Sequence, residues 1–197
     1  MDNTTEAPAP KFTLPGFAMA ILGGVVAAGV VGYVHFFIAN VIGFDLIIVL
    51  AIFMGFAIGW VVGTAARIGR LRSSLVVILV GLIFGIAGYG ARYFYEFNTL
   101  VEMVVEEETP LGGSLDETRT EFLEFWAEEY PPGGYVGYLR YVAQTGFTLT
   151  DDLFADEGTG TPAQGTLVWV TFALEALFAG VVSAAMARST AIGPISQ

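Results

Sequence analysis

The sequence of 197 residues contains no cysteine, a single histidine and a single lysine. Without cysteine, the chain cannot form disulfides, cysteine-ligated iron–sulfur clusters or thiolate zinc sites. One histidine, His35, cannot supply both axial ligands of a bis-histidine haem within one chain. The single lysine, Lys11, lies outside the apolar segments, which excludes a retinal Schiff base within the membrane. We therefore expect neither a metal site nor a cofactor.

Charge is also scarce over four long stretches of the chain. Hydrophobic residues make up 55% of the sequence, and its mean hydropathy is +0.68. An α-helix of about 20 residues crosses the hydrocarbon core of a bilayer, and a helix that is apolar on every side must be surrounded by lipid or protein. These features predict an all-α, polytopic membrane protein with four transmembrane helices, at Phe17–Ile42, Leu46–Ala66, Leu75–Tyr95 and Thr166–Ala187.

The runs divide the chain into four parts. Residues 1–16 form a tail that we expect to be disordered, residues 17–95 carry the first three spans, and residues 166–197 carry the fourth span and a short tail. Between them lies an acidic insertion, residues 96–165. The tail lacks the basic start of a secretory signal, so the first span is expected to stay in the mature protein.

Basic residues predict the orientation. Lys11 precedes the first span, Arg67, Arg70 and Arg72 lie in the turn between spans two and three, and Arg188 follows span four. Four crossings place all of them on one side, which the positive-inside rule assigns to the cytoplasm. We therefore predict a plasma (inner) membrane protein with both termini in the cytoplasm and residues 96–165 outside.

Residues 96–165 hold fifteen acidic residues against two arginines, a net charge of 2 − 15 = −13. A surface of this charge repels nucleic acid and anionic lipid headgroups. It fits either a solvated acidic face or a dock for a basic partner or cations. The spacing of Asp151, Asp152, Asp156 and Glu157 does not match a calcium loop.

The insertion also contains helix signals. Ser114 followed by Glu117 has the pattern of a capping box, which predicts a helix over Leu115–Tyr130 and a second, shorter one over Tyr135–Gln144. We expect the two to pack as an outer cap that buries Trp126. The expected contact residues are Leu115, Phe122, Phe125 and Trp126 on the first helix and Tyr135, Tyr138, Leu139 and Val142 on the second.

Small residues recur at four-residue spacing in every span. In lipid, helix association depends on close backbone approach, which small residues permit. Such faces can pack within one bundle or between subunits, and the pattern does not distinguish the two. The residues are Ala20, Gly24, Ala28 and Gly32 in span one, Gly55, Gly59 and Gly63 in span two, Gly81 and Gly85 in span three, and Ala176, Gly180 and Ala184 in span four.

Three polar residues fall within or near the outer third of the spans: His35, Arg92 and Glu175. Counted along the helices, His35 lies about 10 Å and Glu175 about 13 Å below the outer end of its span. The three residues could form a polar layer that fixes helix register. Alternatively, they mark a proton or ion pathway, or His35 is an axial ligand of a pigment or haem.

The stretch from Gly55 to Gly63, leading into Arg67-Ile68-Gly69-Arg70 and another glycine-rich span, resembles a loose group of uncharacterised small bacterial four-span membrane proteins. Trp169 and Glu175 in the last span fit the same group. The resemblance covers the four spans but not the acidic insertion, and it implies no reaction and no site.

Together these patterns predict a non-catalytic membrane protein. The sequence contains no recognisable nucleophile–base or metal-ligand arrangement. We expect a structural or accessory subunit whose partners are the lipid bilayer and other membrane subunits, or further copies of itself, and not nucleic acid. The alternative is a small oligomeric ion or proton channel, or a transporter, that uses the intramembrane residues Glu175 and His35.

Overall fold

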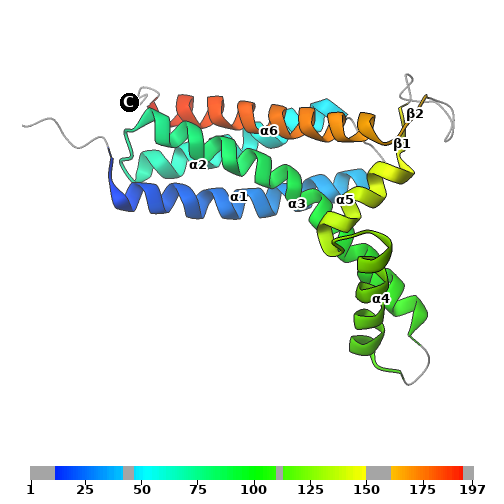
Figure 1. Cartoon of the computed structure of the whole chain (residues 1–197). Coiled ribbons are helices and arrows are strands. Elements are labelled where there is room, and N and C mark those ends of the chain that lie inside the picture. Colours follow the sequence, from blue (N-terminus) through cyan, green and yellow to red (C-terminus); the bar gives the residue numbers. More distant parts are fainter. Residues whose placement is uncertain (1–11, 42–46, 110–112, 150–160, 193–197) are drawn as a thin grey trace, which may run out of the picture. The chain divides into compact units, whose positions relative to one another are not determined.

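The computed structural model describes residues 12–41, 47–109, 113–149 and 161–192 (Figure 1). These residues form six helices and one pair of short strands. The elements are α1 (Leu14–Val41), α2 (Ile47–Ile68), α3 (Ser74–Glu108), α4 (Leu115–Glu129), α5 (Gly134–Thr145), β1 (Phe147–Leu149), β2 (Thr161–Ala163) and α6 (Thr166–Ile192).

Four of the helices, α1, α2, α3 and α6, are long and apolar enough to cross a membrane. Their positions agree with the four runs identified in the sequence. The predicted helical class, with four apolar helices long enough to span a membrane, is therefore confirmed. A pair of antiparallel strands, β1 and β2, adds three residue pairs that the all-α prediction did not include. The sequence also predicts Asp45 as the N-cap of the second span, and this residue lies outside the described residues.

The predicted end of the third helix at Tyr95 is wrong, because α3 continues to Glu108. Phe97, Val101 and Val105 lie four residues apart and are all buried, whereas Glu102 and Glu106 are exposed. Residues at this spacing share one face of a helix. The segment is thus an amphipathic helix that continues directly from an apolar one. Because carboxylates on its exposed face lower the mean hydropathy, the apolar run in the sequence ends before the helix does.

Helix α4 begins where the capping pattern predicts. The Ser114 hydroxyl accepts a hydrogen bond from the Glu117 backbone N–H at 3.4 Å, which satisfies one of the donors left unpaired at a helix start. The four-residue apolar face expected for this helix is only partly correct. Trp126 is buried and Phe122 partly buried, but Leu115 and Phe125 are exposed. Phe125 is about 100° around the helix from Trp126, too far to share its contacts.

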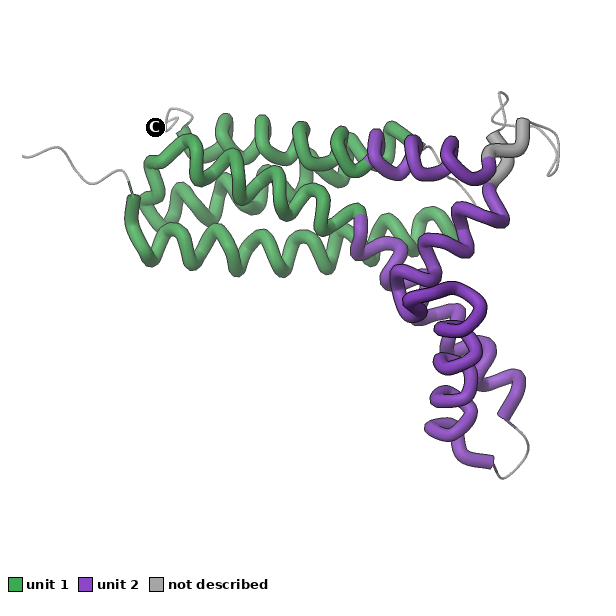
Figure 2. Tube along the Cα trace, in the orientation of Figure 1, with its two compact units in different colours: residues 1–89, 176–197 green, residues 90–175 purple. Residues whose placement is uncertain are grey.

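The chain separates into two compact units (Figure 2). Unit 1 comprises Met1–Tyr89 and Ala176–Gln197, and unit 2 comprises Gly90–Glu175. Helices α3 and α6 each contribute residues to both units. Unit 1 contains α1, α2, the first part of α3 and the last part of α6. Unit 2 contains the second part of α3, α4, α5, the strands and the start of α6.

Candidate functional site

In unit 1, the backbones of α2 and α6 pack directly against each other. A Cβ atom added at Gly59 would lie 2.3 Å from the Ser183 carbonyl oxygen, far inside van der Waals contact. A Cβ atom at Gly55 would lie 2.4 Å from the Ala179 carbonyl oxygen, and one at Gly63 would lie 2.5 Å from the Ala187 carbonyl oxygen. Only glycine allows the two backbones to approach this closely. The facing pairs are Gly55 with Ala179, Gly59 with Ser183 and Gly63 with Ala187.

Glycines of α3 meet the same helix. A Cβ at Gly85 would lie 2.6 Å from the Ala179 carbonyl oxygen, and one at Gly81 would lie 3.0 Å from the Ser183 carbonyl oxygen. Thus α6 packs closely against both α2 and α3. The other glycines singled out in the sequence are also buried: Gly24 faces the Phe84 ring, Gly180 faces Leu82 and Ile86, and Gly32 is buried on α1.

These contacts also give the direction of the helices in unit 1. Residue numbers rise together along the α2–α6 pairs, so these two helices are parallel and end at the same end of the unit. Gly16, near the start of α1, contacts Gly69 just after α2, and the Thr13 hydroxyl donates to the Gly69 carbonyl at 2.9 Å. The start of α1, the α2–α3 turn and the end of α6 therefore share one end.

Unit 2 contains a polar network between α3 and α5. Arg92 Nε donates to Glu96 Oε1 at 2.9 Å, and the Tyr138 hydroxyl donates to Glu96 Oε2 at 3.2 Å. The side chains of Arg92 and Glu96 are only 7% and 12% exposed. The Tyr135 hydroxyl donates to the Gly90 carbonyl at 3.0 Å. Because both oxygens of Glu96 are bonded, this carboxylate joins the two helices.

The network affects the ionisation of the two tyrosines of α5. Burial raises the pKa of Tyr138 well above its ordinary value of 10, and the negative charge of Glu96 raises it further. Burial, followed by the Glu96 charge, also raises the pKa of Tyr135. Tyr138 therefore stays neutral and keeps the proton that it donates to Glu96 over the whole neutral range.

Around the network lies an aromatic core. Trp126 packs against Tyr130, Tyr141 and Phe122 with ring centroids 4.7, 5.5 and 5.6 Å apart. The Trp126 indole N–H donates to the Gly134 carbonyl at 3.3 Å. Phe97 of α3 meets the Tyr138 ring at 5.9 Å. The core thus brings together α3, α4 and α5, whereas the sequence pattern predicted contacts between α4 and α5 alone.

The three polar residues expected in the spans are all buried. His35 is 4% exposed on α1 and belongs to unit 1, whereas Arg92 and Glu175 are 6% and 3% exposed and belong to unit 2. The partner described for Arg92 is Glu96, one helical turn along α3. A shared polar layer of His35, Arg92 and Glu175 stays a prediction.

Sequence reasoning missed one residue of the polar network, one of the aromatic core and one of the helix interface. Glu96 was grouped with the acidic insertion, although its spacing of four from Arg92 is that of an ion pair on a helix. Tyr141 follows Tyr138 by three residues and shares its face. Ser183 is fully buried, and its hydroxyl has no hydrogen-bond partner among the described residues. No sequence signal distinguishes Ser183 from the alanines around it.

Comparison with known proteins finds no match to this chain among family models, curated proteins or solved structures. The resemblance to uncharacterised four-span proteins is thus neither supported nor contradicted. Among the residues that the structure describes, no group of three histidine or acidic side chains is placed to hold a metal ion. What the described geometry provides is a closely packed helix interface, a buried polar network and exposed side chains on α4.

Proposed function

We propose that this chain is a non-catalytic multi-pass membrane protein that acts as a structural or accessory subunit of a membrane assembly. The observation that carries the proposal is the exposed side of α4. Phe125 is 59% exposed on a helix whose own unit already has an aromatic core. Aromatic residues, phenylalanine included, are enriched in protein interfaces relative to the rest of the surface.

The surroundings of Phe125 favour a basic partner. Glu121, Glu128 and Glu129 lie four residues before, three after and four after Phe125, so they border it on the helix surface. All three are exposed. Facing charges of opposite sign speed association and exclude wrong partners. A partner with an aromatic-sized recess rimmed by lysine or arginine would fit this surface.

The proposed orientation has support from unit 1. Arg67, Arg70, Arg72 and Arg188 all belong to the end that holds the start of α1 and the end of α6. By the positive-inside rule this end would be cytoplasmic, in the plasma (inner) membrane. Helices α4 and α5, reached from the opposite end of α3, would then face the extracytoplasmic side and present Phe125 there.

Purification from native membranes in mild detergent tests the proposal. A photo-reactive phenylalanine analogue at position 125 should cross-link to one stoichiometric partner at a basic segment, and the same analogue at exposed Thr120, on another side of α4, should not. Phe125→Ala should release the partner without lowering the melting temperature, because the side chain lies outside the core. Equal cross-linking at both positions, or a chain that always purifies alone, would refute the subunit assignment.

A second candidate, a small oligomeric ion or proton channel or transporter, has one observation in its favour. His35 and Glu175 are both buried on helices that can span a membrane, and such residues often mark ion pathways. Flux through the purified protein in liposomes, abolished by Glu175→Gln without loss of folding, would favour the channel over the subunit.

A further inference from the structure

The turn between α2 and α3 holds an arginine where glycine is usual. The Arg70 N–H donates to the Arg67 carbonyl at 3.0 Å, and the Leu71 N–H donates to the Ala66 carbonyl at 2.9 Å. These two bonds form a Schellman motif, in which the residue after the helix cap is left-handed and most often glycine. Here that residue is Arg70, with a φ of 58°. A side chain in this conformation is strained.

Glycine is present in the turn, one residue earlier. A Cβ at Gly69 would lie 2.3 Å from the Gly16 Cα, so Gly69 is needed for the contact between the turn and α1. The buried side chain of Leu71, 2% exposed, holds the other side of the turn in place. The turn is thus fixed on both sides of Arg70. Backbone strain maintained by its surroundings is a feature of functional positions.

Arg70 is one of four arginines at this end of unit 1. Arg67, Arg70, Arg72 and Arg188 are all exposed, and none forms an ion pair or side-chain hydrogen bond with another described residue. The described residues of unit 1 include no aspartate or glutamate. The positive charge gathered here is therefore not neutralised by the described part of the unit.

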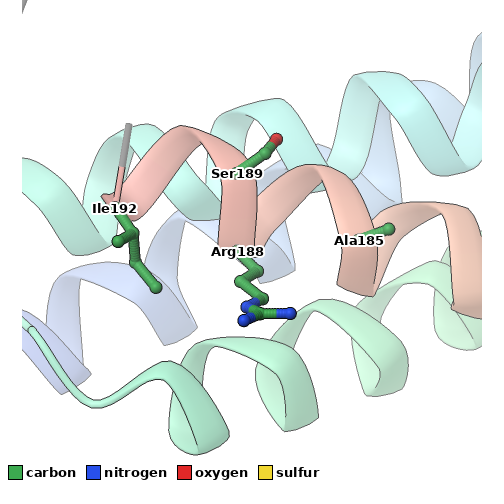
Figure 3. Close-up of a pocket in the computed structure, with 4 residues that line it drawn as sticks. All are labelled: Ala185, Arg188, Ser189 and Ile192. Carbon is green, nitrogen blue, oxygen red and sulfur yellow. The ribbon is translucent and has the colours of Figure 1, made fainter. Parts of the chain in front are cut away.

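Apolar side chains lie beside these arginines. Arg188 and Ile192 line a shallow hollow of about 410 Å³ together with Ala185 and Ser189 (Figure 3). Figure 3 shows the Arg188 side chain extended from α6 toward α3. Ile68, Leu75 and Ile192 are 65%, 67% and 54% exposed. A ligand with both an anionic group and hydrocarbon chains matches this combination better than a free anion does.

We propose that the arginine end of unit 1 binds the phosphate of an anionic phospholipid, with Arg70 and Arg188 as its principal ligands. The guanidinium group presents paired N–H donors that match phosphate oxygens. The acyl chains lie against the exposed Ile68, Leu75 and Ile192. This site does not depend on the partner proposed for α4, and it gives a reason for the presence of an arginine in a conformation that favours glycine.

The test is binding of phosphatidylglycerol to the full chain, purified in a neutral detergent and followed by native mass spectrometry. Removal of one juxtamembrane arginine is expected to weaken binding about fivefold. The affinity of Arg70→Gly for the lipid should therefore be about fivefold lower than that of the parent. Its melting temperature should be the same or higher, because glycine relieves the backbone strain. Loss of binding in this variant cannot be attributed to unfolding. Arg188→Gln should show a similar loss.

Three controls complete the experiment. Arg119→Gln, which removes an exposed arginine of unit 2, should bind as the parent does, and phosphatidylcholine should not compete with phosphatidylglycerol. Inorganic phosphate at equal concentration should also fail to compete. Unchanged binding in both Arg70→Gly and Arg188→Gln would overturn the site. Full competition by inorganic phosphate would overturn the lipid as its ligand.

Discussion

The helices of unit 1 pack through glycine and alanine, whereas those of unit 2 pack through tyrosine, phenylalanine and tryptophan. In unit 1, Gly55, Gly59 and Gly63 bring the α2 backbone against α6. In unit 2, Trp126 and Phe97 lie at the centre of an aromatic cluster. Lipid tails are as apolar as any side chain, so helices in lipid gain mainly from close contact. In water, burial of large apolar surface drives packing. The two cores thus match the two solvents that we propose for them.

The two units also differ in the sign of their charge. Among described residues, unit 1 has four arginines and no acidic residue, whereas unit 2 has twelve acidic residues and three arginines. Most of the acidic residues described in unit 2 are exposed, whereas Glu96 is largely buried and forms an ion pair with Arg92. The contrast fits the two environments that we propose, phosphate groups for unit 1 and a basic protein surface for unit 2.

The largest effect is expected from a larger side chain at the α2–α6 interface, where the packing of unit 1 depends on glycine. Gly59→Leu should abolish folded yield, because even the first added carbon would lie 2.3 Å from a backbone oxygen. Gly59→Ala should cost about 1–3 kcal/mol or more, as overpacking does. Gly90→Ala is the matched control, since its Cβ would meet only the Tyr135 hydroxyl at 3.4 Å. A Gly59→Leu protein that melts like the parent would remove these glycines from the interface.

A core substitution in unit 2 should have a smaller and local effect. Trp126→Ala should cost about 3–5 kcal/mol in unit 2, because a large buried aromatic is lost. Hydrogen exchange should then rise in α4 and α5 but not in α2. Phe125→Ala, one residue away and exposed, should leave exchange unchanged. Equal loss of protection in α2 would show that the two units do not fold separately.

The Glu96 network predicts a pH dependence confined to unit 2. The pKa of Tyr138 is raised in the folded state, so the unfolded chain loses this proton first as the pH rises past about 10. The stability that the network contributes is therefore complete below pH 10 and is lost above it. Tyr138→Phe should lower the free energy of unfolding by about 1–3 kcal/mol at pH 7. It should also reduce the loss of stability above pH 10, measured by tryptophan fluorescence during unfolding. Tyr141→Phe should still lose stability above pH 10 as the parent does. If Tyr141→Phe and Tyr138→Phe behave identically, the contact with Glu96 is not the cause of the pH dependence.

The smallest effect is expected at Ser183. Its side chain is fully buried on α6 with the Cβ facing Gly85 of α3, and its hydroxyl has no hydrogen-bond partner among the described residues. Removing an unsatisfied hydroxyl is neutral or favourable, so Ser183→Ala should raise stability by up to about 1 kcal/mol. The readout is the thermal midpoint in detergent. A clear loss of stability would mean that the hydroxyl is bonded and that unit 1 packs through more than small side chains.

Local signals in the sequence were enough for the helices themselves. The apolar runs identify α1, α2 and α6, and the Ser114 pattern identifies the start of α4, because both depend on residues close together in the chain. The glycine ladder of α2 was also visible. The residues of α6 that face these glycines, Ala179, Ser183 and Ala187, could not be identified from the sequence. Many other small residues would also allow two helices to approach closely.

Tertiary structure decided the rest. The extension of α3 to Glu108 follows from packing of Phe97, Val101 and Val105 on a core that other helices complete. The role of Glu96 depends on Tyr138, which is distant in sequence. Arg70 is left-handed because Gly69, its neighbour, is held against Gly16 of another helix. Composition and spacing determine which segments form helices, but the partner of each side chain depends on contacts between segments that the chain order does not specify.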